Sequence, residues 1–183
     1  MNQYYLMSQL PSLDGLTDAS PLPITENRFL ELCEQLLPKK MLVALKGINL
    51  VPQKSTTPTG YRFIDKWNDY ERDLRLALGK VRAEKLGKTF EDNDSFISTE
   101  LIQIARFAVE NENPLEAEVF LNGYRARFLE DLRPTDPFCE DAVFYYALKL
   151  KIMARIKLFD SEKGVLAYQD IYNSIMSKDK QEA

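Results

Sequence analysis

The 183-residue sequence contains no histidine, and this absence removes several kinds of catalytic and metal site at once. Histidine is the commonest general base near neutral pH, a member of the Ser-His-Asp triad and the commonest ligand of transition metals. Glycine-rich phosphate loops are also missing, because neither a GxGxxG nor a Walker A sequence occurs. We therefore expect a protein that is not an enzyme and that uses no metal, nucleotide or other cofactor.

Long apolar runs and clusters of cysteine are lacking as well. No uninterrupted apolar stretch approaches the roughly 18 residues that a membrane-spanning helix requires, and the N-terminus lacks the basic start of a signal peptide. Cys33 and Cys139 lie far apart, make no disulfide framework and fall within helical patterns, so both are interpreted as small core hydrophobes. These features predict a cytoplasmic protein without a transmembrane segment.

The residues that are present have the composition of a globular domain. Hydrophobic residues make up 45% of the chain and charged residues 28%, and the length suits one domain. Apolar residues recur at helical spacing along most of the chain, and no alternating segment requires a strand. The sequence therefore predicts a single all-α domain over residues 1–183, bundle-like, with about seven helices and an extended N-terminal arm.

Capping signals indicate where several helices begin. Thr25 is expected to be an N-cap, with Ile24 and Phe29 spaced as a hydrophobic staple. Asn113-Pro114 and Asp136-Pro137 each place a capping side chain before a proline at the first helical position. The predicted helices cover about residues 25–37, 38–47, 61–86, 99–110, 113–132, 136–159 and 163–176.

The segments between and around these helices are predicted to be non-helical. Residues 1–23 are interpreted as an extended arm lying across helices, because their apolar start leads into a stretch rich in Pro, Ser, Asp and Gly. Residues 49–60 carry two prolines, a glycine and several hydroxyl side chains, which predicts a loop, and residues 177–183 are expected to form a frayed tail. The acidic run 91–94 lacks the glycine and terminal glutamate of an EF-hand loop and is interpreted as a polar connection.

Two of the predicted helices have strong apolar stripes. Between residues 61 and 86 apolar side chains recur at alternating steps of four and three, and Gly79 would accommodate a bend in the second half. The last helix is expected to bury one side. That side consists of Val165, Tyr168, Ile171, Tyr172 and Ile175.

Charge is divided unevenly along the chain. Residues 38–88 contain twelve Lys and Arg but five Asp and Glu, a net charge of +7, whereas residues 89–143 contain four bases and thirteen acids, a net charge of −9. Such polarity either orients different partners on different faces, or is neutralised internally by pairing between basic and acidic helices. The sequence leaves both interpretations open.

The basic segment contains the candidate binding residues. Aromatic side chains alternate there with Arg62, Lys66, Arg72 and Arg75, a composition that nucleic acid binding also uses. Three of the four aromatics lie on the apolar stripe, where they belong to the core, and a pI of about 5.1 argues against a dedicated nucleic acid binder. We therefore interpret the four basic residues as a docking face for a protein partner, with no binding of nucleic acid.

The N-terminal segment resembles a known family. The stretch Tyr4–Leu13, with the sequence YYLMSQLPSL, is followed by a proline-flanked arm and by Ile24–Cys33, with the sequence ITENRFLELC. Together they are similar to the start of a bacterial family of helical proteins that are encoded within V-type ATPase gene clusters.

The second half of the chain has a further resemblance. Asn113-Pro114 with its acidic and aromatic helix, and Phe138–Phe159 with Tyr145-Tyr146 and Leu148-Lys149-Leu150-Lys151, look like the helical repeats of the C/d-type socket protein of V-type and A-type rotary ATPases. That protein is a non-catalytic helical socket between the central rotor shaft and the membrane proteolipid ring. Because the chain is roughly half as long as the socket protein, it is either a shortened equivalent or an accessory component of another kind.

The resemblances imply a function that the residues alone do not. They imply a non-catalytic subunit of a bacterial V-type ATPase, an enzyme of proton or other ion transport, in which the chain couples the soluble and membrane parts through the central stalk. The rotor shaft and the proteolipid ring would be its partners, at the cytoplasmic face of the inner membrane. The alternative is a free-standing helical adaptor or regulatory protein-interaction module without a rotary partner.

Overall fold

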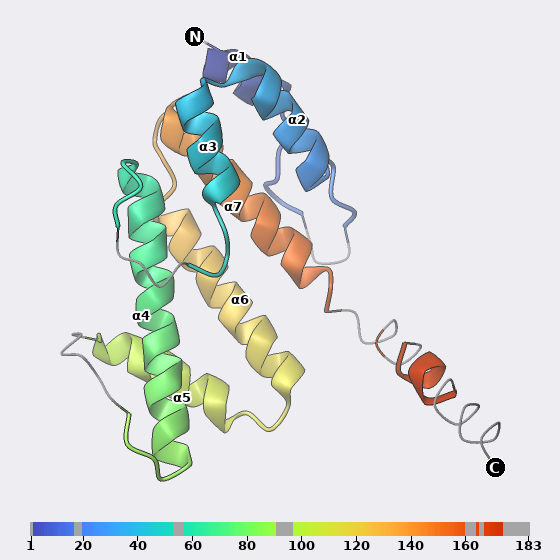
Figure 1. Cartoon of the computed structure of the whole chain (residues 1–183). Coiled ribbons are helices and arrows are strands. Elements are labelled where there is room, and N and C mark those ends of the chain that lie inside the picture. The colour runs from blue at the N-terminus through green and yellow to red at the C-terminus, as the bar shows by residue number, and fades with distance from the viewer. Residues whose placement is uncertain are drawn as a thin grey trace, which may run out of the picture.

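The computed structural model describes residues 2–16, 20–52, 57–90, 97–159, 164 and 167–173. In this part of the chain all regular secondary structure is α-helical, which confirms the predicted all-α fold, and the helices form an elongated bundle (Figure 1). Residues 167–173 form a helical segment at the C-terminal end. The longer helices are α1 (Asn2–Gln9), α2 (Glu26–Leu36), α3 (Lys39–Gly47), α4 (Arg62–Lys85), α5 (Thr99–Glu110), α6 (Pro114–Asp131) and α7 (Glu140–Ile156).

Local capping explains where α2 and α6 begin. Thr25 Oγ1 accepts a hydrogen bond from the Arg28 amide at 3.2 Å, and Asn113 Oδ1 accepts one from the Leu115 amide at 3.0 Å. The first amides of a helix have no partner inside the helix. These bonds satisfy one such amide in each helix and so stabilise the two N-termini. Both predicted helix starts are confirmed.

The start of α7 differs from the prediction. Asp136 Oδ1 accepts a hydrogen bond from the Phe138 amide at 2.9 Å and closes a turn, so the helix begins only at Glu140 and ends at Ile156. Cys139 is its N-cap and is half-buried, whereas Cys33 is fully buried as predicted. The predicted core position of Cys139 is therefore wrong.

The sequence predicted an extended N-terminal arm, but part of this arm is helical. Residues 2–9 form α1, which packs on α2 and α7 and buries Leu6 completely. Residues 10–16 and 20–23 are non-helical, and Leu13 from this stretch is also buried. Because α1 has eight residues and is weakly amphipathic, it depends on packing against the other helices rather than on its own propensity.

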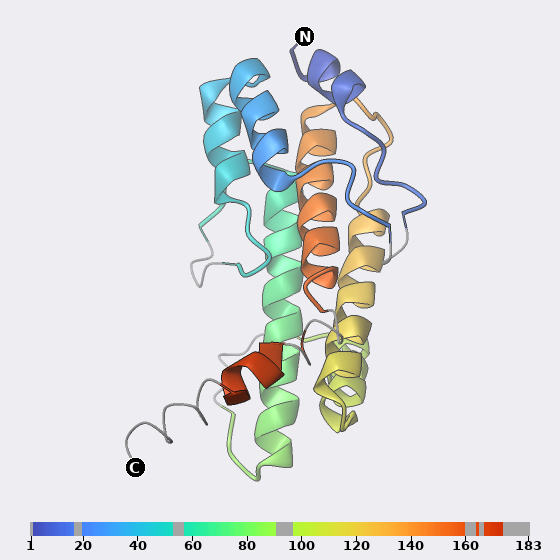
Figure 2. The same ribbon diagram turned by 90° about the vertical axis from the view of Figure 1, so that its right-hand side faces the viewer.

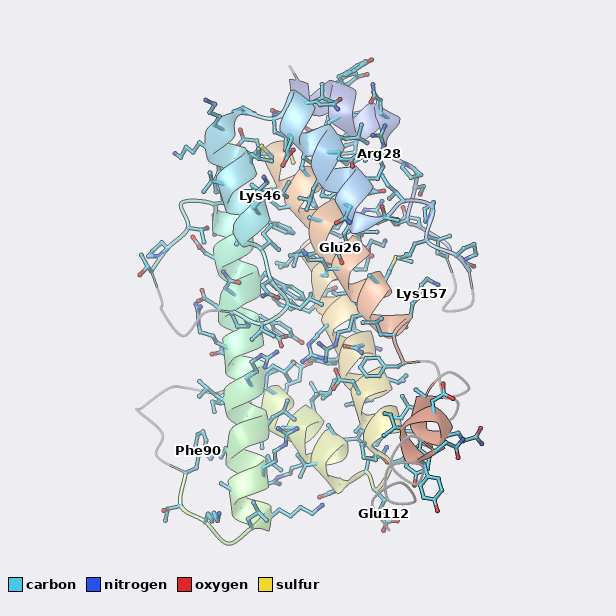
Figure 3. All side chains as sticks on the ribbon, turned by 45° about the vertical axis from the view of Figure 1, so that its right-hand side comes forward. Glu26, Arg28, Lys46, Phe90, Glu112 and Lys157 are labelled. Atoms are coloured by element: carbon cyan, nitrogen blue, oxygen red, sulfur yellow. The ribbon has the colours of Figure 1, made fainter. Side chains whose placement is uncertain are left out.

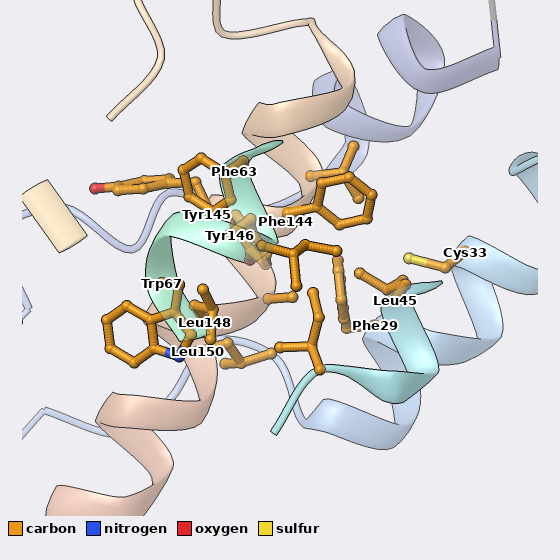
Figure 4. Close-up of a cluster of buried hydrophobic side chains, with 14 of the residues drawn as sticks. Phe29, Cys33, Leu45, Phe63, Trp67, Phe144, Tyr145, Tyr146, Leu148 and Leu150 are labelled. Carbon is orange, nitrogen blue, oxygen red and sulfur yellow. The ribbon is translucent and has the colours of Figure 1, made fainter. Parts of the chain in front are cut away.

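Buried apolar side chains form two clusters that follow one another along α4. Figure 2 shows that α4 runs along the length of the bundle. The upper core joins α1, α2, α3, the first half of α4 and α7, and Figure 4 shows part of it. The lower core joins the second half of α4 to α5 and the first half of α6. Its buried residues are Leu74, Ala77, Leu78, Val81, Leu101, Ile104, Ala105, Ala108 and Leu121.

Helix α4 passes through both cores without interruption. Its 24 residues make it about 36 Å long, and its bounds lie within one residue of the predicted range 61–86. It continues through Gly79, where a Cβ atom would lie 3.0 Å from the Phe90 ring. Phe90 lies beside the lower half of α4 in Figure 3, so the glycine makes room for this ring.

The prediction of a buried face on the last helix is wrong for the residues that the structure describes. Tyr168, Ile171 and Tyr172 are 68%, 59% and 51% exposed. Val165 and Ile175, the acidic run 91–94 and the tail 177–183 lie outside the described residues. The described parts of the loop 49–60 are non-helical, as expected.

Candidate partner-binding surface

The four predicted docking residues lie on α4, but they do not share one face. Arg62 and Lys66 are one turn apart and exposed, and neither forms an ion pair with a residue that the structure describes. Arg75 lies thirteen positions after Arg62, which is roughly 140° around the helix at ~100° per residue. The structure therefore brings Arg62 and Lys66 together and separates Arg75 from them.

The other two predicted residues are engaged within the molecule. Arg72 forms an ion pair with Asp69, one turn before it. Arg75 Nε donates to Glu71 Oε1 at 3.0 Å, and Glu71 is completely buried. A change of Arg75 to Glu would place a second carboxylate against Glu71, so Arg75 is part of the internal structure rather than a simple surface charge.

Glu71 belongs to a buried charged layer, defined here as Glu71, Asn122 and Arg125. The Arg125 guanidinium donates to both carboxylate oxygens of Glu71, with Nε to Oε2 and Nη2 to Oε1 each 3.0 Å. Its Nη1 donates to Asn122 Oδ1 at 3.1 Å, and all three side chains are buried. On α4 the residue one turn before Glu71 is Trp67 of the upper core, and Leu74 of the lower core follows it. The layer therefore separates the two cores.

The charged layer extends to α7 through a second carboxylate. Arg125 Nη1 lies 3.5 Å from Glu118 Oε1, and Arg155 Nε donates to the same oxygen at 3.2 Å. This chain of ion pairs links α4, α6 and α7. Glu71 is bonded to two guanidinium groups and has no exposed surface, so a substrate cannot reach it. The layer is a positioning element for helices.

This layer was not predicted from the sequence, although the sequence contains a signal for it. Glu71 lies on the apolar stripe of α4, four residues after Trp67 and three before Leu74. Arg125 likewise lies on an apolar stripe of α6, four residues after Leu121 and four residues before Leu129. Opposite charges at the centre of two apolar stripes are the pattern that a buried ion pair leaves in a sequence.

A second polar cluster holds the N-terminal arm against α7. Tyr145 OH donates to Glu130 Oε1 at 2.7 Å, and Lys149 Nζ donates to Asp14 Oδ1 at 2.6 Å and to Glu130 Oε1 at 2.8 Å. Burial raises the pKa of Tyr145. Burial alone would lower the pKa of Lys149, but its bonds to the carboxylates raise it above its usual value. The phenol therefore stays protonated and the amine charged, so this pair is not an activated acid and base.

The N-terminal segment lies against Phe138 and helix α7. The rings of Tyr4 and Phe138 are 4.3 Å apart, Tyr146 OH donates to the Pro11 carbonyl at 2.9 Å, and the bond between Asp14 and Lys149 closes the same region. The N-terminal segment Tyr4–Asp14 and helix α7 thus form one packed unit in the upper half of the bundle.

The described parts of the basic and acidic segments do not neutralise each other through ion pairs. Among the described residues, no ion pair joins a Lys or Arg of 38–88 to an Asp or Glu of 97–143. The ion pair that does link the two segments joins an acid of the basic segment, Glu71, to a base of the acidic segment, Arg125. Arg62 and Lys66 of α4 are exposed and pair with none of the described acidic residues, which is compatible with the first of the two interpretations of the charge pattern.

A groove of about 320 Å³ runs beside α4, between the end of α3 and the described parts of the loop 49–60. Two of its carboxylates are paired within the groove: Asp65 Oδ1 accepts bonds from the Thr59 amide and hydroxyl at 2.8 Å, and Asp69 binds Arg72.

The described residues contain no group of three or more His, Cys, Asp and Glu that could hold a metal ion. Within the same residues, no helix is both long and apolar enough to cross a membrane. No family model, no curated protein and no solved structure matches the chain.

Proposed function

We propose that the chain is a non-catalytic subunit of a bacterial V-type ATPase, held at the cytoplasmic face of the membrane by its partners and coupling the soluble and membrane parts near the central stalk. The resemblances of Tyr4–Leu13 with Ile24–Cys33, and of Phe138–Phe159, suggest the complex. The observation that supports a binding role is the exposed positive charge of Arg62 and Lys66, which no described residue of the acidic segment pairs with. An acidic face of another subunit is the partner that this charge fits.

The proposed mechanism is mechanical. Helix α4 crosses both cores as one piece, and the charged layer ties it to α6 and, through Glu118, to α7. A body of this kind resists twisting, because any rotation of α4 against α6 would separate the buried Glu71 and Arg125. Such a body can transmit torque or hold two other subunits at a fixed distance.

Purification of the native complex tests this proposal. The protein is isolated from its own cells in mild detergent through an affinity tag, and the accompanying proteins are identified by mass spectrometry. Recovery of ATPase catalytic and proteolipid subunits in fixed ratio is the expected result. Recovery of the protein alone, or with unrelated partners, would overturn it and leave the free-standing adaptor as the better interpretation.

A pair of matched variants locates the surface. Arg62→Glu with Lys66→Glu should reduce recovery of the other subunits at least about tenfold, because two attractive charges become repulsive at one contact. Arg106→Glu with Arg127→Glu makes the same change of charge at exposed positions of α5 and α6 and should leave recovery unchanged. Equal recovery with both double variants would show that Arg62 and Lys66 are not at the interface.

A further inference from the structure

A pocket of about 230 Å³ lies between α4, the start of α5 and the second half of α6. Its lining includes the half-buried rings of Tyr70, Tyr124 and Phe128 and the buried side chain of Leu101. The Tyr70 ring stacks on the Phe128 ring, and its centroid lies 6.2 Å from that of Tyr124. Drug-sized ligands occupy pockets of about 300–1,000 Å³, so this smaller pocket suits a single side chain. We call it the aromatic pocket.

The two tyrosine hydroxyls of the aromatic pocket have different surroundings. Tyr124 OH donates to Glu100 Oε1 at 2.5 Å. Burial and this bond raise the pKa of Tyr124 to about 12, so the phenol remains the proton donor of the bond. Tyr70 OH is buried and forms no hydrogen bond to any residue that the structure describes. A buried hydroxyl without a partner costs free energy, so a ligand that bonds to it gains affinity.

The rim of the aromatic pocket has an excess of negative charge. Glu100 and Asp131 are exposed there, and neither carboxylate forms an ion pair with a described residue. Arg127 adds one exposed positive charge to the rim. Two acids and one base leave a net charge of −1, and the surrounding segment 89–143 has a net charge of −9. We therefore expect a cation rather than an anion as the ligand.

The helices around the aromatic pocket do not reverse this sign. The N-terminal end of α5 attracts anions and the C-terminal end of α6 attracts cations, so the two helix dipoles oppose each other at the pocket. Ser98 Oγ already accepts a hydrogen bond from the Leu101 amide of α5 at 3.3 Å. On α4, Lys66 and Asp73 lie one turn to either side of Tyr70, and their charges cancel. The net charge of the rim therefore decides which ligand the pocket favours.

We propose that the aromatic pocket binds the guanidinium group of an arginine side chain of another protein. A guanidinium is planar, so it can stack on a tyrosine ring while its N–H groups donate to Glu100 and Asp131. Free arginine fits less well, because its own carboxylate would meet the acidic rim, whereas an arginine within a polypeptide has no such group. This site uses other residues than Arg62 and Lys66 and does not depend on the identity of the proposed complex.

A nuclear magnetic resonance titration of the full-length protein with a blocked tripeptide, acetyl-Gly-Arg-Gly-amide, tests the binding. Saturable shifts are expected at the backbone amides of Tyr70, Leu101 and Tyr124, which line the pocket. The same peptide with citrulline in place of arginine keeps the shape but not the charge and should bind at least about tenfold more weakly. The peptide with lysine should also bind more weakly, because an ammonium group does not stack.

Two protein variants should move the affinity for the arginine peptide in opposite directions. Glu100→Gln with Asp131→Asn removes both carboxylates of the rim and should weaken binding at least about tenfold. Arg127→Gln removes the competing positive charge and should tighten binding about twofold or more. The control, Glu110→Gln with Glu112→Gln, changes the net charge by the same amount at the other end of α5 and should alter the affinity less than about twofold.

Four results would overturn the proposal. The first is the absence of saturable shifts with the arginine peptide, or equal binding of the citrulline peptide. The second is an unchanged affinity in Glu100→Gln with Asp131→Asn when circular dichroism shows that this variant is folded. The third is binding of free arginine as tight as that of the blocked peptide, which would identify a small guanidino compound as the ligand. The fourth is a set of shifts at the pocket that depends on protein concentration without peptide, which would identify a second copy of the chain as the occupant.

Discussion

The strongest test of the fold is to remove one partner of the charged layer. Replacing Glu71 by Leu keeps a side chain of similar size on the stripe of α4 but leaves Arg125 charged and buried. Arg125 would keep its bond to Asn122 at 3.1 Å and its weaker contact with Glu118 at 3.5 Å, and would lose both oxygens of Glu71. Arg75 loses less, because its side chain is 40% exposed and can turn to water.

The magnitude follows from what remains around Arg125. Breaking a buried ion pair by removing one partner costs about 3–5 kcal/mol of folding free energy. We expect the lower end, about 3 kcal/mol, because Asn122 and Glu118 still compensate part of the charge of Arg125. For a domain of this length that corresponds to a decrease in Tm of roughly 6–12 °C.

Urea unfolding provides the assay. Far-ultraviolet circular dichroism follows the helices, and the fluorescence of Trp67, the single tryptophan and a buried neighbour of the layer, follows its surroundings. The double variant Glu71→Leu with Arg125→Met removes both charges and should return to within about 1 kcal/mol of the wild type. The two single changes should therefore not add.

The exposed pair of Arg28 and Glu31 provides the control. Both of its side chains are 58% exposed, so Glu31→Leu should change the free energy of unfolding by less than about 0.5 kcal/mol. The reasoning would be refuted if Glu71→Leu had an effect as small as that of Glu31→Leu. It would also be refuted if the double variant were destabilised by the sum of the two single changes.

Three further changes test other parts of the structure. The bond from Lys149 lowers the pKa of Asp14, so the stability that Asp14 contributes is present above its unfolded pKa of about 4 and is lost as the pH falls through its lower folded pKa. Urea midpoints in a pH series should show this acid loss, and Lys149→Met should make it smaller. Asn113→Ala should cost ~1 kcal/mol and lower the Tm by a few degrees, because it removes the cap of α6. Leu6→Ala should cost about 2–5 kcal/mol, and a cost below about 1 kcal/mol would mean that α1 is not part of the core.

The features predicted correctly from the sequence are those that neighbouring residues determine. Thr25 and Asn113 cap helices through bonds to amides two or three positions away, and the apolar stripe of α4 repeats along one helix. Asp136 shows the limit of such signals, because the same side chain can cap a helix or close a turn and the prediction chose the wrong one.

The features that were missed depend on distant parts of the chain. Leu6 is buried because α2 and α7 cover α1, and nothing near residue 6 in the sequence indicates this. Glu71 and Arg125 are 54 positions apart, and their pairing needs the register of α4 against α6. Arg75 was assigned to a docking face because its charge suggested the surface, whereas its partner Glu71 is in the interior.

The separation of the two cores has a consequence for the order in which the protein folds during synthesis. The buried residues of the lower core all lie within one continuous part of the sequence, between Leu74 and Leu121. The upper core joins Leu6 near the beginning of the chain to Ile152 in α7. The nascent chain can therefore assemble the lower half first, while α1, α2 and α3 keep apolar surface exposed until α7 has left the ribosome. Until then these N-terminal helices are the part of the nascent protein that most needs a chaperone.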